Sequence, residues 1–210
     1  LVWLSGIRNL GSIRIKRLIE HFGSAKAVWE ADREDLARVK GISRELGRQI
    51  LASKNEDKLR HCMDSLEKLN ISTVPITSSY YPALLKEIYN PPYLLYVKGD
   101  KHVLKQSCIA VVGSRNASYY GKKVAFKLAE QLARAGFSVV SGLARGIDSY
   151  AHKGALAVGG RTIAVMGNGL DVIYPRENFQ LMKEIPRNGL LLSEYPPGTS
   201  PLRGNFPARN

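Results

Sequence analysis

The segment Ile109-Ala110-Val111-Val112-Gly113-Ser114-Arg115 decides the fold, because it is the first of three apolar strands that each end in a glycine-rich turn. Strand 137–141 precedes the second turn, at 142–148, and strand 162–166 precedes the third, at 167–169. The pattern predicts helices at about 120–135, 149–158 and 177–184, and a last strand at 189–193. Alternating strands and helices predict a Rossmann-like α/β fold with a doubly wound, mainly parallel sheet.

In such a sheet all three turns lie at the carboxyl edge, where ligands bind. Glycine lets the backbone approach a ligand closely, and helix N-termini present free N–H groups to anions. The sequence therefore predicts a phosphate-binding edge. The residues predicted to form it are Gly113, Ser114, Arg115, Arg145, Gly146, Gly167, Asn168, Gly169 and Arg176.

The glycine spacing argues against a nucleotide cofactor at this edge. A dinucleotide fold would show G-x-G-x-x-G after the first strand, whereas here Arg115 would occupy the space of the pyrophosphate. The chain also lacks the G-x-x-x-x-G-K-[ST] loop that binds nucleoside triphosphates. We therefore expect no cofactor, and consider Tyr174, Phe179 and Tyr195 as rings that either stack on bases or pack in the core.

One residue at the end of the second turn and one on the helix that follows are expected to have structural roles. Asp148 is well placed to cap the helix that follows, with Ser149 as the alternative. His152 lies on that helix with no nucleophile paired to it, so we expect it to be packed or hydrogen-bonded. No catalytic residue is predicted.

Composition points to a polyanionic partner. The 210 residues carry 31 Lys and Arg against 18 Asp and Glu, a formal net charge of +13, and neutralising phosphates releases counterions. The two cysteines, Cys62 and Cys108, form neither a zinc ligand set nor a disulfide framework, which favours no metal and a reducing cytoplasm. No apolar run has membrane-spanning length, so no membrane partner is expected. The missing initial methionine and the basic last residues suggest a fragment.

The first 70 residues predict a small all-α domain of short helices. Residues 36–51 resemble a helix-hairpin-helix unit, and residues 4–22 resemble a looser first copy. That family turns the amides of a Gly-hydrophobe-Gly hairpin toward a DNA phosphate. Ser43 and Arg8 stand here in place of the second glycine. Direct DNA contact and a structural or protein-binding role therefore both stay open.

A resemblance to a known family is carried by the three turns, by Tyr174-Pro175 with Asn178, by the segment 193–196 and by the final run 206–210. Through these features, residues ~75–210 resemble the DNA-processing protein A family (DprA, also called Smf). The resemblance implies a helix-hairpin-helix or SAM-like domain at 1–70 and an extended Rossmann-like DNA-binding domain at 71–210, truncated at its C-terminus. Carried over by position, Gly113, Ser114 and Arg115 contact a phosphate. Arg176 stands where the family often has lysine.

The same resemblance implies a function. It indicates a non-catalytic cytoplasmic protein that binds single-stranded DNA, protects incoming strands in natural transformation, loads the RecA recombinase and forms a homodimer through its Rossmann-like domain. An alternative is a nucleotide-binding or nucleotide-hydrolysing enzyme, for which Glu194 is the one carboxylate near the edge. A second alternative is a protein-interaction adaptor.

Overall fold

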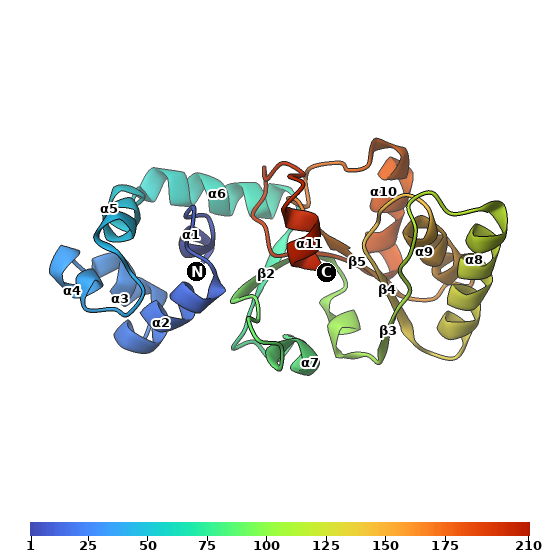
Figure 1. Cartoon of the computed structure of the whole chain (residues 1–210), viewed down its shortest axis with the longest axis horizontal. Helices are drawn as coiled ribbons and strands as arrows, with labels where there is room; N and C mark the ends of the chain where they lie inside the picture. The colour runs from blue at the N-terminus through green and yellow to red at the C-terminus, as the bar shows by residue number, and fades with distance from the viewer.

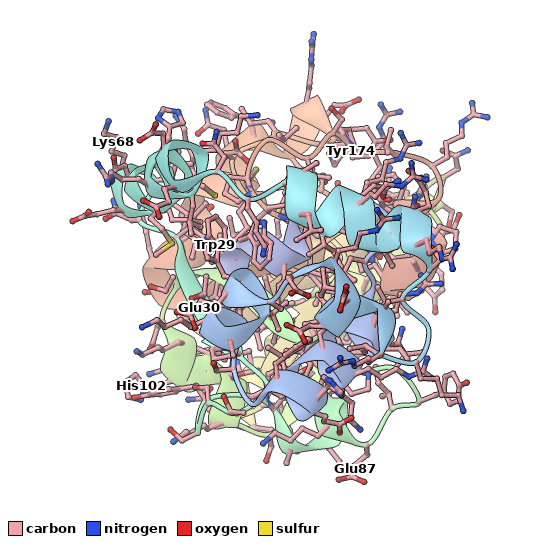
Figure 2. All side chains as sticks on the ribbon, turned by 90° about the vertical axis from the view of Figure 1, so that its left-hand side faces the viewer. Trp29, Glu30, Lys68, Glu87, His102 and Tyr174 are labelled. Carbon is pink, nitrogen blue, oxygen red and sulfur yellow. The ribbon has the colours of Figure 1, made fainter.

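The computed structural model describes all residues, 1–210, and consists of a helical part followed by a mixed α/β part (Figure 1). Twelve buried hydrophobic residues between Leu4 and Ile50 form the core of the helical part. Figure 2 faces this end of the molecule, where many nitrogen-tipped side chains project around the rim. The helices of the helical part are α1 (Val2–Ser5), α2 (Ser12–Phe22), α3 (Ala25–Glu30), α4 (Arg33–Ala37), α5 (Arg44–Ala52) and α6 (Glu56–Lys68).

Arg14 joins the two hairpin turns of the helical part. Its Nε donates to the Gly41 carbonyl at 3.0 Å, and its Nη1 donates to the Asn9 carbonyl at 2.9 Å. Gly41 has φ +88°, a conformation that side chains disfavour, which explains the glycine at the second turn. The two helix-hairpin-helix copies therefore lie side by side. Ser43, at the position of the second family glycine, caps α5 by accepting from the Leu46 amide.

The α/β part is built on one six-stranded sheet in the order β1-β2-β6-β5-β4-β3. Strands β3 to β6 are parallel, whereas β2 runs antiparallel to both β1 and β6. The strands are β1 (Ser72–Pro75), β2 (Leu94–Gly99), β3 (Cys108–Ala110), β4 (Ser138–Ser141), β5 (Thr162–Met166) and β6 (Leu190–Ser193). The helices are α7 (Ala83–Lys86), η1 (Lys101–Lys105), α8 (Tyr119–Arg134), α9 (Ile147–Ala157), η2 (Arg176–Asn178), α10 (Phe179–Asn188) and α11 (Asn205–Arg209).

Helices α8, α9 and α10 cover one face of the parallel strands. Val139 packs against α8 and α9, and on the same face Ala164 and Leu191 pack against α10. The opposite face is covered by η1 and by the segment around Tyr81, which pack on Ile163 and Leu190. Consecutive parallel strands with right-handed crossovers place their helices on one face. The α/β class is confirmed, and within it the helices of these strands share a face instead of covering both.

The predicted elements of the α/β part are confirmed with small shifts at their ends. The predicted helix at 177–184 is split into η2 and α10, which extends to Asn188. Leu66 of α6 packs into the core under the sheet, so the end of the helical part also contacts the α/β part. None of the helices has the length and apolar character needed to span a bilayer.

Candidate phosphate-binding site

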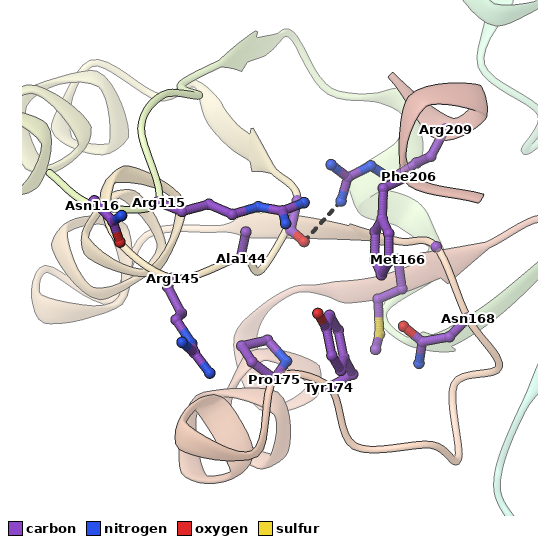
Figure 3. A pocket seen from close by; sticks show the side chains of 12 residues that line it. Arg115, Asn116, Ala144, Arg145, Met166, Asn168, Tyr174, Pro175, Phe206 and Arg209 are labelled. Atoms are coloured by element: carbon purple, nitrogen blue, oxygen red, sulfur yellow. Dashed lines mark hydrogen bonds between the residues drawn. The ribbon is translucent and has the colours of Figure 1, made fainter. Parts of the chain in front are cut away.

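A pocket of about 250 Å³ lies at the carboxyl edge of the parallel strands, where the sequence predicts a phosphate site (Figure 3). All three glycine turns contribute to it, and the other walls are formed by α11 and by Tyr174 and Pro175 before η2. The lining residues are Arg115, Asn116, Gly142, Ala144, Arg145, Met166, Gly167, Asn168, Tyr174, Pro175, Phe206 and Arg209.

The first two turns are packed directly on each other. Gly146 has φ +74°, and a Cβ placed on it would collide with the carbonyl oxygens of Ser114 and Arg115. The Ile147 amide donates to that same Ser114 carbonyl at 3.2 Å. Gly113 is needed for a similar reason, since a Cβ there would lie 2.8 Å from Ile147 Cγ1. Gly146 lets the two backbones approach and Gly113 makes room for the Ile147 side chain, and together they position Arg115.

Three buried polar side chains hold the second turn in shape. Asp148 Oδ2 accepts from the amides of Gly142 at 3.1 Å and Ala144 at 3.4 Å. Asn178 donates through Nδ2 to the Leu143 carbonyl at 2.8 Å, and Ser149 Oγ donates to the Ala144 carbonyl at 2.6 Å. The expected cap of α9 by Asp148 is wrong, because Gly146 is the N-cap residue and the carboxylate instead turns back to the loop.

The third turn is closed by its own side chain and by α11. Asn168 donates through Nδ2 to the carbonyls of Gly169 and Val172, at 3.0 and 2.7 Å. The ring of Phe206 lies against Gly167, where a Cβ would be 2.9 Å from Cδ1. Gly167 and Asn168 line the pocket, whereas Gly169 packs against the segment 196–198 outside it.

Three guanidinium groups converge on the pocket. Arg145 forms an exposed ion pair with Glu177, 2.6 Å between Nη2 and Oε1. Arg115 is exposed, has no ion-pair partner, and lies 5.5 Å from the ring centroid of Phe206. Arg209 donates from Nη1 to the carbonyls of Gly142 and Val165, at 2.9 and 3.0 Å.

The electrostatics of Arg209 favour an anion in the pocket. Burial lowers the pKa of its guanidinium, the nearby Asp148 carboxylate raises it, and the neighbouring charge of Arg115 lowers it again. Two cations that repel each other across one pocket are both stabilised when an anion binds between them. The arrangement suits a phosphate, since guanidinium forks match its oxygens.

The structure places the other predicted site residues outside the pocket lining. Ser114 Oγ accepts from the Asn116 amide at 3.1 Å and is exposed on the first turn. Arg176 is exposed on η2. Phe179 begins α10, and Lys183 Nζ lies 4.0 Å from the centroid of the Phe179 ring.

Of the three candidate stacking rings, only Tyr174 lines the pocket. It is 39% exposed, 5.3 Å from the ring centroid of Phe206, and precedes Pro175 through a cis bond. Tyr195 instead lines a separate cleft against the helical part, together with Glu194, whose pKa is raised by burial. Glu194, the carboxylate on which the alternative of a nucleotide-hydrolysing enzyme rests, therefore does not line the pocket at the carboxyl edge.

His152 is fully buried and hydrogen-bonded, as expected. Thr162 Oγ1 donates its proton to the Val139 carbonyl at 2.7 Å, so it accepts from His152 Nδ1, also at 2.7 Å. The ring is therefore the Nδ1–H tautomer, and its Nε2 has no hydrogen-bond partner. Burial lowers the pKa of His152 to about 3, so the imidazole is neutral at physiological pH.

Sequence reasoning missed Phe206 and Arg209 as pocket residues. Both lie on α11, more than 60 positions after the first two turns begin, and neither follows a strand. The only sequence signal was the final run 206–210, which the family resemblance included without giving it a role.

Comparison with known families matches both parts of the chain. The family model described as DNA recombination-mediator protein A matches residues 72–210, and a SAM-like helix-hairpin-helix tandem matches residues 4–53. Protein Smf of Synechocystis is 40% identical over the whole of this chain and 54% of its own length. The DNA processing protein DprA of Bacillus subtilis is 44% identical over 73% of this chain and 52% of its own length.

Two solved structures are similar as well. DNA processing protein A from Streptococcus pneumoniae superposes with a TM-score of 0.82 and 34% identity, over 99% of this chain and 70% of that one. DNA processing protein A from Helicobacter pylori, described for its single-stranded DNA binding mode, has a TM-score of 0.60 and 36% identity over 66% of this chain and 62% of that one. The chain spans about half the length of the curated relatives it matches.

Proposed function

This chain belongs to the DNA recombination-mediator protein A family, and we propose that its carboxyl-edge pocket binds the phosphate backbone of single-stranded DNA. The observation that carries the proposal is the pair of guanidiniums, Arg115 and Arg209, beside a pocket walled by aromatic rings. Arg115 is free of acidic partners, so its charge is available to a ligand. The single-strand binding described for the Helicobacter pylori relative supports the choice of polymer.

Each predicted residue has a role in this proposal. Arg115, with Ser114 beside it, contacts a phosphate, and Gly113 and Gly146 allow the close packing of the second turn that positions both. Arg145 exchanges its exposed partner Glu177 for a phosphate, an exchange that costs little because such surface pairs contribute at most about 1 kcal/mol. The remaining proposed contacts are Gly167, Asn168, Gly169 and Arg176 for phosphates, and Tyr174, Phe179 and Tyr195 for bases.

The proposal extends to the biological role. The protein protects incoming strands in the cytoplasm, loads the RecA recombinase onto them, and dimerises through its Rossmann-like domain, without catalytic turnover. Membership of a family of DNA processing proteins supports this reading. Protection and RecA loading both need the strand first to be held, so DNA binding is the step to test.

The test is a titration of labelled oligo-dT against duplex DNA of equal length at two salt concentrations. The proposal expects strong preference for the single strand and an affinity that falls steeply with salt, because bound phosphates release counterions. Equal affinity for the two polymers would reduce the pocket to a generic basic surface and overturn the proposal.

A further inference from the structure

The first turns of α8 and α9 carry an exposed aromatic and basic surface beside the pocket. Tyr119 is 83% exposed and Tyr120 is 76% exposed, although rings of this size normally bury most of their area. Lys123 follows Tyr119 by four positions and Tyr120 by three, so the three side chains share one side of the helix. We call this surface the α8–α9 patch. It consists of the exposed Tyr119, Tyr120, Lys123 and Lys153 together with the half-buried Lys122 and Tyr150.

Close packing of the two helices makes the patch continuous. A Cβ on Gly154 of α9 would collide with the Phe126 carbonyl of α8, so the backbones nearly touch there. Lys122 and Tyr150 lie one turn before this contact on their respective helices. Lys122 Nζ is 5.9 Å from the Tyr150 ring centroid, and Lys153 Nζ is 5.0 Å from the same centroid.

The patch carries positive charge that no acidic residue neutralises. Its three lysines form no ion pair, in contrast to Lys127 further along α8, which pairs with Glu130 at 2.9 Å. The sequence holds no Asp or Glu between residues 101 and 129, and none between 149 and 170. A surface with uncompensated cations attracts a polyanion.

The patch is also connected to the pocket. Arg115 and Asn116 line the pocket, and Ser118, two residues later, caps α8 by accepting from the Gly121 amide at 3.1 Å. A strand that leaves the pocket past Asn116 therefore meets Tyr119 and Tyr120 next.

From this geometry we propose that the α8–α9 patch binds the stretch of single-stranded DNA that continues beyond the pocket. Tyr119 and Tyr120 stack on unpaired bases, and the lysines contact the phosphates between them. This inference rests on the proposed function of the pocket. It favours a single strand over a duplex, because the faces of unpaired bases are free to stack on aromatic side chains.

The experiment measures the affinity of the protein for oligo-dT strands from about 4 to about 20 nucleotides long, by fluorescence anisotropy. The double variant Tyr119→Ala/Tyr120→Ala is compared with the parent protein and with Tyr89→Ala. Tyr89 is a suitable control because it is 96% exposed on the segment between α7 and β2 and lines none of the described pockets. Circular dichroism checks that all three proteins are equally helical.

The expected result depends on strand length. The shortest strands bind the double variant as tightly as the parent, while the longest bind it more weakly by roughly five- to a hundredfold for each of the two stacking rings removed. The variant Tyr119→Phe/Tyr120→Phe, which keeps both rings, retains most of the parent affinity, and Tyr89→Ala changes nothing.

If affinity depended on strand length in the same way for the parent and the double variant, the proposed role of the α8–α9 patch would be wrong. The proposal for the pocket is tested separately, because it expects Arg115→Ala to lower the affinity for strands of every length. A parent protein that fails to bind oligo-dT at all would overturn both proposals.

Discussion

Replacement of Gly146 by alanine tests whether contact between the first two turns positions Arg115. The residue has φ +74° and ψ −128°, which an L side chain adopts only with strain of about 1–3 kcal/mol. The new Cβ would also collide with the carbonyl oxygens of Ser114 and Arg115, so the first turn has to retreat. A total loss of about 3 kcal/mol lowers the Tm by roughly 6–12 °C in a chain of this size.

The effect on binding follows from the same displacement. A retreating first turn carries the Arg115 guanidinium out of the pocket, and a charge-assisted hydrogen bond is worth about 1.5–3 kcal/mol. Oligo-dT affinity should therefore fall roughly tenfold or more. Both quantities are accessible, the first by thermal unfolding and the second by titration.

Gly136→Ala is the matched control, because Gly136 also has a positive φ, +88°, but an added Cβ there meets nothing within 4 Å. It should lower the Tm by only a few degrees and leave DNA affinity unchanged. If Gly146→Ala matched this control in both stability and affinity, the turn-to-turn contact would not be what holds Arg115.

Two further changes test the supporting interactions. Asn178→Ala leaves the Leu143 carbonyl without its donor and should cost about 1–3 kcal/mol by chemical denaturation; an unchanged midpoint would contradict the role given to this side chain. His152 has a pKa of about 3 when folded and about 6.5 when unfolded, so the unfolded state binds more protons below pH 6.5. The free energy of unfolding should therefore fall by up to about 1.4 kcal/mol per unit as the pH drops from 6.5 towards 3. His152→Asn should remove this slope, and a slope that persisted would point to another group.

The sequence was sufficient for the strands and turns, because apolar runs followed by glycine are local signals. The carboxyl edge of β3 to β5 follows from those signals and from the handedness of the crossovers. Arg115 and Arg145 belong to the turns themselves, so their position at this edge follows from the same local signals.

Roles that depend on packing between distant segments could not be predicted in the same way. The sequence predicts that a ligand approaches closely at Gly113 and Gly146, but in the structure the Ile147 side chain packs against Gly113 and the Ser114–Arg115 backbone packs against Gly146. Arg209 reaches Gly142 across 67 positions, a contact with no local pattern. Tyr195 follows a strand at the same sheet edge, yet its ring lines the cleft against the helical part.

The most direct test of the central claim, that strand phosphates bind at this pocket, is the salt dependence of oligo-dT affinity in Arg115→Ala. If Arg115 neutralises one phosphate, the slope of log affinity against log salt should become shallower by about 0.7, and affinity should fall equally for strands of any sequence. Lys86→Ala, an exposed lysine on α7, should keep the parent slope. Parallel slopes and equal affinities for Arg115→Ala and the parent protein would contradict the account.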